Sequence, residues 1–295
     1  MMFDLSGSHP PSCFNLKGLV IQSIFYLCRF NSIFMLLNAI IWDVNPEIFR
    51  IGGFAVRWYG LLFALGFVFG YIIMGKIFKK EHIQPKLLDT LTTYMVVGTV
   101  VGARLGHCLF YEPEYYLSNP LEILMIWKGG LASHGAAIGI LLALYFFSRK
   151  ANKSYLWIVD RIVIVVALAG FFIRTGNLMN SEIYGVQTDL PWGFIFVRWG
   201  ETVPKHPTQI YEGLSYLLIF VLLYTLYNKK YKTLKEGTIT GLFLIILFAV
   251  RFLIEFIKEP QVGFEEQMAL NMGQLLSIPF ILAGIGLIFY KRRGS

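Results

Sequence analysis

Residues 157–179 read WIVDRIVIVVALAGFFIRTGNLM, an apolar run with Asp160 and Arg161 near its start and Arg174 and Asn177 near its end. Its length matches the roughly 20 apolar residues that an α-helix needs to cross a bilayer. The whole chain of 295 residues has the same character, because 56% of it is hydrophobic and only 15% is charged. Soluble domains carry about 25% charged residues, so the composition excludes a soluble globular protein. We predict an all-α polytopic membrane protein.

Seven such runs predict seven core transmembrane helices joined by short loops. They cover approximately residues 54–77, 88–110, 131–147, 157–179, 208–227, 238–257 and 268–290. Lysine and arginine gather in alternate loops and in the tail, at residues 76–86, 149–153, 229–235 and 291–293. Because basic loops stay on the cytoplasmic side, this pattern predicts a cytoplasmic C-terminus and a first core helix that starts outside.

Two segments fall outside the helical pattern. Residues 180–207 are too polar to span and combine turn residues with a strand-like run at residues 194–197, which predicts a small extracytoplasmic cap. Residues 1–42 include an interrupted apolar run that fits an eighth, N-terminal hydrophobic helix, an uncleaved signal anchor, or an upstream extension that is not normally translated. We favour the last, with Met35 as the natural start. The predicted seven-helix domain is then residues 43–295.

Several other classes of protein find no support. Cys13, Cys28 and Cys108 form no CxxC pair, so neither a disulfide framework nor a metal site is indicated. The net charge of +8 is explained by the basic loops rather than by a nucleic-acid partner. The chain contains no phosphate-binding loop, zinc-protease or serine-hydrolase motif. We therefore predict no metal and no cofactor.

Ionisable side chains inside the spans carry the predicted function, because each costs at least ~2.5 kcal/mol unless it is paired or faces water. Arg104, His134, Arg174 and Arg251 fall in the outer halves of their predicted spans. A buried cluster of positively charged side chains needs an anion. Arginine can bind a lipid phosphate through two parallel hydrogen bonds. His134 would act as a base or as a phosphate partner. Glu255, one turn after Arg251, could instead neutralise that arginine, and both interpretations stay open.

Other residues in the spans have structural interpretations. Gly98, Gly102 and Gly106 are spaced four apart, which is typical of closely packed membrane helices. Asp160 and Arg161 lie near the predicted cytoplasmic boundary, and we interpret them as structural. These residues are therefore expected to support the fold and not the chemistry.

The segment that begins at Arg174 resembles a family signature. Arg174-Thr175-Gly176-Asn177-Leu178-Met179-Asn180-Ser181-Glu182 is similar to the GRxGNxxNxE pattern of the prolipoprotein diacylglyceryl transferases. Further motifs of that family follow one another over about residues 40–290: RWYG at 57–60, GAR at 102–104, GGLASHG at 129–135, HPTQIYE at 206–212, RFLIEF at 251–256 and MGQLLSIP at 272–279. Ile173 and Ser181 depart from the signature, and Leu247 stands where some members have a functional tyrosine.

The resemblance implies transfer of the diacylglyceryl group of phosphatidylglycerol to the thiol of the lipobox cysteine of a preprolipoprotein, with release of glycerol phosphate. This is the first step of bacterial lipoprotein maturation, at the outer leaflet of the inner membrane. The implied catalytic residues are His134, Arg174 and Arg251, and the implied substrate-binding residues are Arg174, Asn177, Glu182, Tyr59, Arg104, His206 and Glu255. The proton acceptor is either His134 or an oxygen atom held by arginine. The alternatives are a transporter or flippase for an anionic lipid and a structural scaffold, but a scaffold leaves the buried arginines unexplained.

Overall fold

The structure, a computed structural model, describes residues 39–260 and 268–289. The predictions for residues 1–42 therefore lie almost entirely outside the described residues. The long helices are α2 (Trp58–Lys80), α3 (Pro85–Phe110), α5 (Ser133–Ala151), α6 (Tyr155–Met179), α7 (Thr208–Lys230), α8 (Thr238–Ile254) and α9 (Met272–Phe289). Shorter helical elements are α4 (Pro113–Ser118), η1 (Pro120–Leu124), η2 (Ile126–Lys128), η3 (Val197–Trp199) and η4 (Glu255–Ile257). The strands are β1 (Ile40–Trp42), β2 (Glu47–Ile51), β3 (Phe54–Arg57) and β4 (Phe194–Phe196).

The described chain divides into two compact units. The smaller unit contains residues 39–43 and 187–206. Within it β1 pairs in parallel with β4, with Ile40 opposite Phe194, and the Trp42 and Phe194 rings lie 5.2 Å apart. Residue 205 closes the unit, because the Lys205 backbone exchanges two hydrogen bonds with Phe194, at 2.8 and 2.9 Å. The strand-like run predicted at residues 194–197 is confirmed over Phe194–Phe196.

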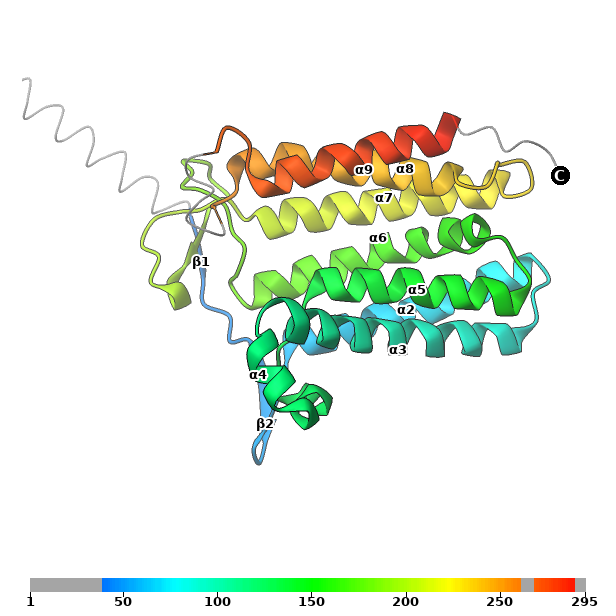
Figure 1. The fold of residues 1–295 in the computed structure, drawn as a ribbon. Helices are drawn as coiled ribbons and strands as arrows, with labels where there is room; N and C mark the ends of the chain where they lie inside the picture. Colours follow the sequence, from blue (N-terminus) through cyan, green and yellow to red (C-terminus); the bar gives the residue numbers. More distant parts are fainter. Residues whose placement is uncertain (1–38, 261–267, 290–295) are drawn as a thin grey trace, which may run out of the picture. The chain divides into compact units, whose positions relative to one another are not determined.

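The larger unit, residues 44–186 and 207–289, contains all the long helices. They run side by side, and α6 lies among α2, α5, α7 and α8 (Figure 1). The buried core forms around α6, with Ile158, Ile164 and Ala167 fully covered by protein. Because hydrocarbon offers no hydrogen bonds, helices that satisfy their own backbone are the expected solution for so apolar a chain.

Glycine brings two pairs of helices into backbone contact. A Cβ atom added at Gly98 of α3 would lie 2.7 Å from the carbonyl oxygen of Gly139 in α5, and one added at Gly106 would lie 2.6 Å from the Cα of Gly135. The predicted packing role of the glycines in α3 is confirmed. A Cβ atom added at Gly241 of α8 would likewise lie 2.8 Å from the carbonyl oxygen of Gly284 in α9.

Six helices of the described chain are long and apolar enough to cross a membrane: α2, α3, α6, α7, α8 together with η4, and α9. The protein is thus a mostly helical membrane protein, as the composition predicts. The predicted span at residues 131–147 appears as α5, which is not among the six. Its first residues, Ser133 and His134, and its last turn, with Arg149 and Lys150, are polar.

The structure corrects two predicted helix starts and adds a few short strands to the mostly helical chain. Residues 54–57, which we expected to open the first span, form β3, and this strand makes an antiparallel hairpin with β2. The helix therefore starts at Trp58. The last span starts at Met272 instead of residue 268. The β2–β3 hairpin and the β1–β4 pair add two small sheets to the described chain. An apolar run alone did not reveal these strands, because β-branched and aromatic residues suit both structures.

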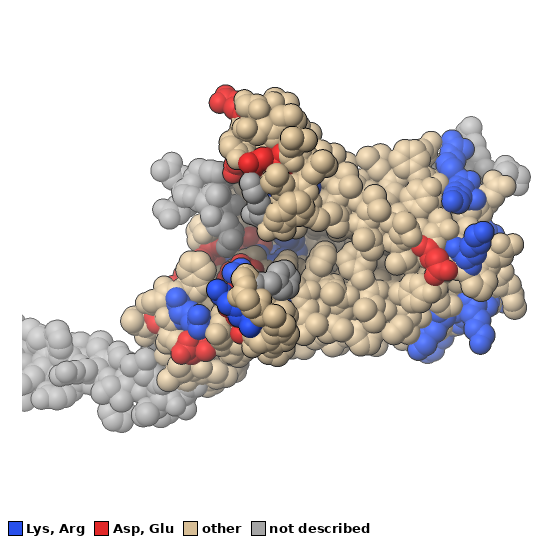
Figure 2. Space-filling view, turned by 90° about the horizontal axis from the view of Figure 1, so that it is seen from below, with Lys and Arg blue, Asp and Glu red and all other residues tan. Residues whose placement is uncertain are grey.

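One end of the large unit is basic. The last turns of α2, α5 and α7 contain Lys79, Lys80, Arg149, Lys150, Lys229 and Lys230. Figure 2 shows lysine and arginine side chains gathered at that end of the helices. The basic loops predicted from the sequence therefore meet at a single end of the bundle.

Below these basic residues a buried network ties four helices together. Arg161 of α6 pairs with Glu81 at 2.8 Å, and Glu81 also accepts a hydrogen bond from the Trp157 indole at 3.0 Å. Asp160 accepts hydrogen bonds from the backbone N–H groups of Gly237 and Thr240, both at 2.8 Å. Asp160 thereby satisfies the open N–H groups at the start of α8. The structural roles predicted for Asp160 and Arg161 are confirmed.

Candidate active site

The final turn of α6 begins the candidate site. The Arg174 Nη1 donates to Asn177 Oδ1 at 3.3 Å, and the Asn177 amide donates to Glu182 Oε1 at 2.8 Å. Ser181, with φ of +56°, turns the chain back, so that the Glu182 N–H reaches the Asn177 carbonyl at 3.0 Å. Three residues of the predicted site, Arg174, Asn177 and Glu182, are thus brought together within one turn of chain.

The start of α7 holds this turn in place. Gln209 donates through its amide to the Glu182 carbonyl at 2.7 Å, and the Thr208 hydroxyl donates to the Ile183 carbonyl at 2.9 Å. Both Thr208 and Gln209 are buried. Ile183 has φ of +62°, a conformation that a β-branched residue adopts only when its surroundings impose it. The two side chains of α7 therefore fix a strained loop next to Arg174.

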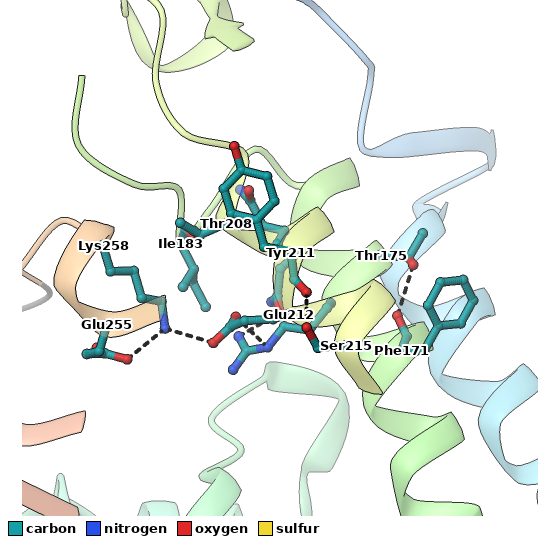
Figure 3. Close-up of polar contacts among 12 residues, drawn as sticks. Phe171, Thr175, Ile183, Thr208, Tyr211, Glu212, Ser215, Glu255 and Lys258 are labelled. Carbon is teal, nitrogen blue, oxygen red and sulfur yellow. Dashed lines mark hydrogen bonds and ion pairs between the residues drawn. The ribbon is translucent and has the colours of Figure 1, made fainter. Parts of the chain in front are cut away.

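Glu212, one turn further along α7, lies at the centre of the charged groups (Figure 3). It is completely buried, and its Oε2 lies 2.9 Å from Arg174 Nε. Its Oε1 lies 3.3 Å from Lys258 Nζ, which also lies 3.4 Å from Glu255 Oε2. We refer to Arg174, Glu212, Glu255 and Lys258 as the ion cluster. It connects α6, α7 and the end of α8.

Backbone contacts fix the far side of the ion cluster. Lys258 forms an antiparallel bridge with Gly185, and the Val186 N–H donates to the Ile257 carbonyl at 3.0 Å. Gly273 of α9 lies against the Glu255 carboxylate so closely that an added Cβ would be 2.5 Å from Glu255 Cδ. The ion cluster is therefore enclosed by backbone from the α6–α7 loop and from α9.

Arg251 approaches the ion cluster from the last turn of α8. Within residues 39–260 and 268–289 its guanidinium makes neither an ion pair nor a hydrogen bond. Glu255, which we considered as its neutralising partner, pairs with Lys258 instead. The Tyr216 side chain of α7 is close enough to interact electrostatically with both Arg174 and Arg251. The two arginines predicted to share a ligand therefore both lie near one tyrosine.

The charges correct one expectation. The sequence suggested a group of cations that lacked counter-charges, but Arg174 and Lys258 already contact carboxylates. A buried cation and a buried carboxylate stabilise each other, and the removal of either leaves the other uncompensated. Of the cations at this site, Arg251 is the one for which the described residues offer no counter-ion, so an incoming anion is expected to meet Arg251 first.

Tyr59 also joins the site. It lies in the first turn of α2, and its ring packs against Gly176, where an added Cβ would be 2.8 Å from Tyr59 Cδ2. It lies within electrostatic range of Glu182 and Arg174. Gly176 of the signature thus provides the space that brings the Tyr59 ring up to α6.

Arg104 is placed differently from the prediction that it lines the pocket. Its guanidinium donates to the carbonyls of Glu122 at 2.6 Å, Ile123 at 2.9 Å, Gly129 at 2.6 Å and Gly130 at 3.2 Å. Its Cζ also lies 4.9 Å from the centre of the Tyr116 ring. Four of the five N–H groups of the Arg104 side chain are therefore used by the chain itself, which leaves a single N–H and no paired donors for a phosphate.

The two predicted histidines remain predictions. His134 is exposed in the first turn of α5, with its ring 5.3 Å from that of Phe110 and 5.7 Å from that of Tyr111. His206 belongs to the small unit. Burial lowers the pKa of the His206 imidazole below its ordinary value, so this side chain is neutral at pH 7.

Sequence reasoning missed Glu212 and Lys258. Glu212 entered the sequence analysis only as the last residue of the HPTQIYE motif, and Lys258 was given no role there. One signal was available, because Thr208, Glu212 and Tyr216 recur every four residues and so share a face of α7. A carboxylate on a face that also carries buried polar residues is expected to have a cationic partner.

The apolar helices and the buried charges at their non-basic end define a multi-pass membrane protein with an intramembrane polar site. Residues 46–290 match the family described as prolipoprotein diacylglyceryl transferase, and the chain belongs to this family. Relatives named phosphatidylglycerol–prolipoprotein diacylglyceryl transferase include one from Tolumonas auensis, 50% identical over 85% of this chain and 97% of the relative. Those from Porphyromonas gingivalis and Chloroherpeton thalassium are 49% and 46% identical, over 84% and 85% of this chain and 93% of each relative.

Proposed function

We propose that the chain transfers the diacylglyceryl group of phosphatidylglycerol to the lipobox cysteine of a preprolipoprotein, at the ion cluster and Arg251. The names of its relatives specify phosphatidylglycerol and prolipoprotein, and membership of the family makes it a transferase of lipoprotein maturation. One observation carries the choice of site. Arg174 and Arg251, from different helices, act on the same side chain, Tyr216. Among the described residues, none of the ion pairs involves Arg251.

The chemistry requires two kinds of group. A thiol attacks as its thiolate, forming a carbon–sulfur bond to the glyceryl carbon while the carbon–oxygen bond to the phosphate breaks. The electron pair of that bond leaves with glycerol phosphate, whose charge must be stabilised by cations already in position. The thiol proton passes to His134 or to a phosphate oxygen. The reaction needs no oxidant, and its groups are all acids, bases and cations.

The structure supports specific roles for the residues. Glu212 lies against the Nε of Arg174 and Asn177 accepts from its Nη1, so the remaining N–H groups of the two terminal nitrogens are the ones proposed to meet the phosphate oxygens. Arg251 supplies the second positive charge. Asn177 and Glu182 orient Arg174 from one side, while Glu255 orients Lys258 from the other. Tyr59 forms a wall of the site, where its ring packs against Gly176.

The same proposal includes the arrangement in the membrane. The seventh span is α5, which packs against α3 through glycine and lies alongside the other helices (Figure 1). The basic end is cytoplasmic by the positive-inside rule, which also places the C-terminus of the chain in the cytoplasm. The ion cluster lies at the opposite ends of α6, α7 and α8 and so faces the outer leaflet of the bacterial inner membrane. We assign residues 43–295 to the transferase domain, about residues 180–207 to its extracytoplasmic cap, and residues 1–42 to an N-terminal extension whose last residues, Ile40–Trp42, pair with β4.

A transfer assay tests the proposed function. Purified protein in vesicles that contain phosphatidylglycerol is mixed with a lipobox peptide, and the mass of the peptide is measured. A gain of one diacylglyceryl group is expected. Movement of lipid across the bilayer without any gain in peptide mass would instead support the transporter.

Matched arginine variants test the proposed site. Arg174→Gln and Arg251→Gln should each abolish or severely reduce transfer, whereas Arg161→Gln removes a buried arginine that pairs with Glu81 at the opposite end of α6 and should retain transfer in the folded fraction. If His134→Gln keeps substantial activity, the phosphate oxygen is the proton acceptor. Equal loss in the Arg161 and Arg174 variants would show that only stability is being measured, and would remove the assignment of Arg174.

A further inference from the structure

The connection between α3 and α5, residues 111–132, folds back along α3. Arg104 lies six residues before Phe110, the last residue of α3, and an α-helix rises 1.5 Å per residue. Its Cα atom is therefore about 9 Å below the end of the helix, yet its guanidinium donates to carbonyls in the middle and in the last part of the connection, including those of Glu122 and Gly129. The Ala132 N–H also donates to the Ala103 carbonyl, at 2.9 Å. The last part of the connection therefore lies beside residues 103 and 104 of α3, about two turns before the end of that helix.

This placement poses a problem that Arg104 solves. Because α3 is apolar enough to span a membrane, non-helical backbone beside it lies where water is scarce, and unpaired carbonyls there are costly. Four carbonyls of the connection are satisfied by the single Arg104 side chain. Gly130, with φ of +74°, permits the approach, because an added Cβ would lie 2.8 Å from Arg104 Nη1.

The other face of the connection is strongly apolar and uncovered by protein. Tyr116 is buried against Arg104, with only 8% of its surface exposed. In contrast, Leu117, Leu121, Leu124 and Trp127 are 71%, 74%, 72% and 76% exposed. The exposed apolar face begins at Phe110, the last residue of α3, and reaches Leu131, two residues before α5; these side chains are 69% and 57% exposed. An apolar surface that is continuous with membrane-spanning helices is one that lipid covers.

We infer that residues 113–131 form a re-entrant segment inserted in the outer leaflet, and that Arg104 holds it at this depth. The estimated depth of about 9 Å falls in the range at which interfacial apolar residues meet the acyl chains. Of its two acidic residues, Glu122 accepts a hydrogen bond from Tyr115 at 2.9 Å, and Glu114 lies exposed in the first turn of α4, at the start of the segment. The partner of this surface is the bilayer, and the inference goes beyond the proposed transfer reaction.

Depth-dependent quenching tests the insertion. In a background with Cys13, Cys28 and Cys108 replaced by serine or alanine, Leu121→Cys is labelled with a fluorophore in phosphatidylcholine–phosphatidylglycerol vesicles. Leu218→Cys, at an exposed position in the middle of α7, is the control in lipid, and Asp189→Cys, at an exposed position of the small unit, is the control in water. Nitroxide lipids with the quencher high on the acyl chain should quench the label at Leu121, and iodide should not. If the label at Leu121 behaves like that at Asp189, the segment is not inserted.

Variants of Arg104 test what holds the segment. Arg104→Met removes all four hydrogen bonds, so the label at Leu121 should lose its quenching by nitroxide lipids and become accessible to iodide. Arg104→Lys keeps the charge but not the planar fork of donors and should give an intermediate loss. The label at Leu218 should remain deep in both variants, which reports that the helices are intact. Unchanged quenching at Leu121 in both variants would overturn the role of Arg104, and a loss at both Leu121 and Leu218 in both would show that Arg104 supports the whole fold instead.

Discussion

Glu212 and Lys258 form a buried ion pair whose contribution can be measured by a double-mutant cycle. Lys258→Met leaves the carboxylates of Glu212 and Glu255 with Arg174 as their cation, and Glu212→Gln leaves Arg174 and Lys258 with Glu255. Removing one partner of a buried pair costs about 3–5 kcal/mol. The completely buried Glu212 and the 3.3 Å separation from Lys258 place both single variants in that range.

The double variant should be less damaged than the sum of the single variants. With Glu212 and Lys258 both replaced, Arg174 and Glu255 remain as one cation and one carboxylate, so the net charge of the ion cluster is again zero. Residues in contact typically show coupling of about 0.5–3 kcal/mol, and we expect the upper part of this range. The free energy of unfolding in mixed detergent–SDS micelles measures the cycle, and Lys258→Arg, which keeps the charge, is the control.

The refuting result is simple additivity. If the losses in the two single variants sum to the loss in the double variant, the 3.3 Å contact does not couple Glu212 to Lys258. Transfer activity of the double variant gives a second reading. It should stay low even where stability is regained, because Arg174 has lost the carboxylate that occupies its Nε.

Three further predictions concern other parts of the chain. Asp160→Ala removes the acceptor for two N–H groups at the start of α8 and should lower the free energy of unfolding by about 1 kcal/mol, while transfer by the folded protein is unchanged. Gly102→Leu places a side chain where a Cβ would already be 2.9 Å from Gly139 Cα; it should destabilise the protein by about 1–3 kcal/mol, more than Gly60→Leu, where an added Cβ meets no atom within 4 Å. The pKa of His206 is lowered from its ordinary 6.5, so the native state binds fewer protons and stability should fall as the pH drops below about 6.5; unfolding midpoints at neutral and acidic pH measure this, and His206→Gln should remove that contribution.

Much of the helical fold can be predicted from the sequence because lipid imposes one solution on the backbone. Runs such as residues 157–179 must satisfy their own hydrogen bonds, so length and hydropathy suffice to place α6. The start of α2 was harder to predict. Residues 54–57 are as apolar as the helix that follows, and only pairing with β2, a contact made through backbone, identifies them as a strand.

The site was predictable where its residues are close in sequence. Arg174, Asn177 and Glu182 lie within nine residues, and their contacts follow from one helix end and one turn. Glu212 and Lys258 are 46 residues apart, and nothing in either local sequence specifies the other. Arg104 shows a different limit. Its partners are backbone carbonyls, which every residue has. The pattern of side chains in the sequence therefore could not show whether Arg104 holds the α3–α5 connection or binds the substrate.

The glycine contact between α3 and α5 limits how a bulky molecule can reach the interior. Backbone meets backbone there, with Gly98 and Gly106 leaving no room for even a methyl group opposite Gly139 and Gly135. This backbone contact contains no side chains that can rotate aside, so we expect α3 and α5 to move together as one rigid pair. A lipid with two acyl chains that enters laterally from the bilayer is therefore expected to pass between other helices, at an interface lined by side chains that can rotate.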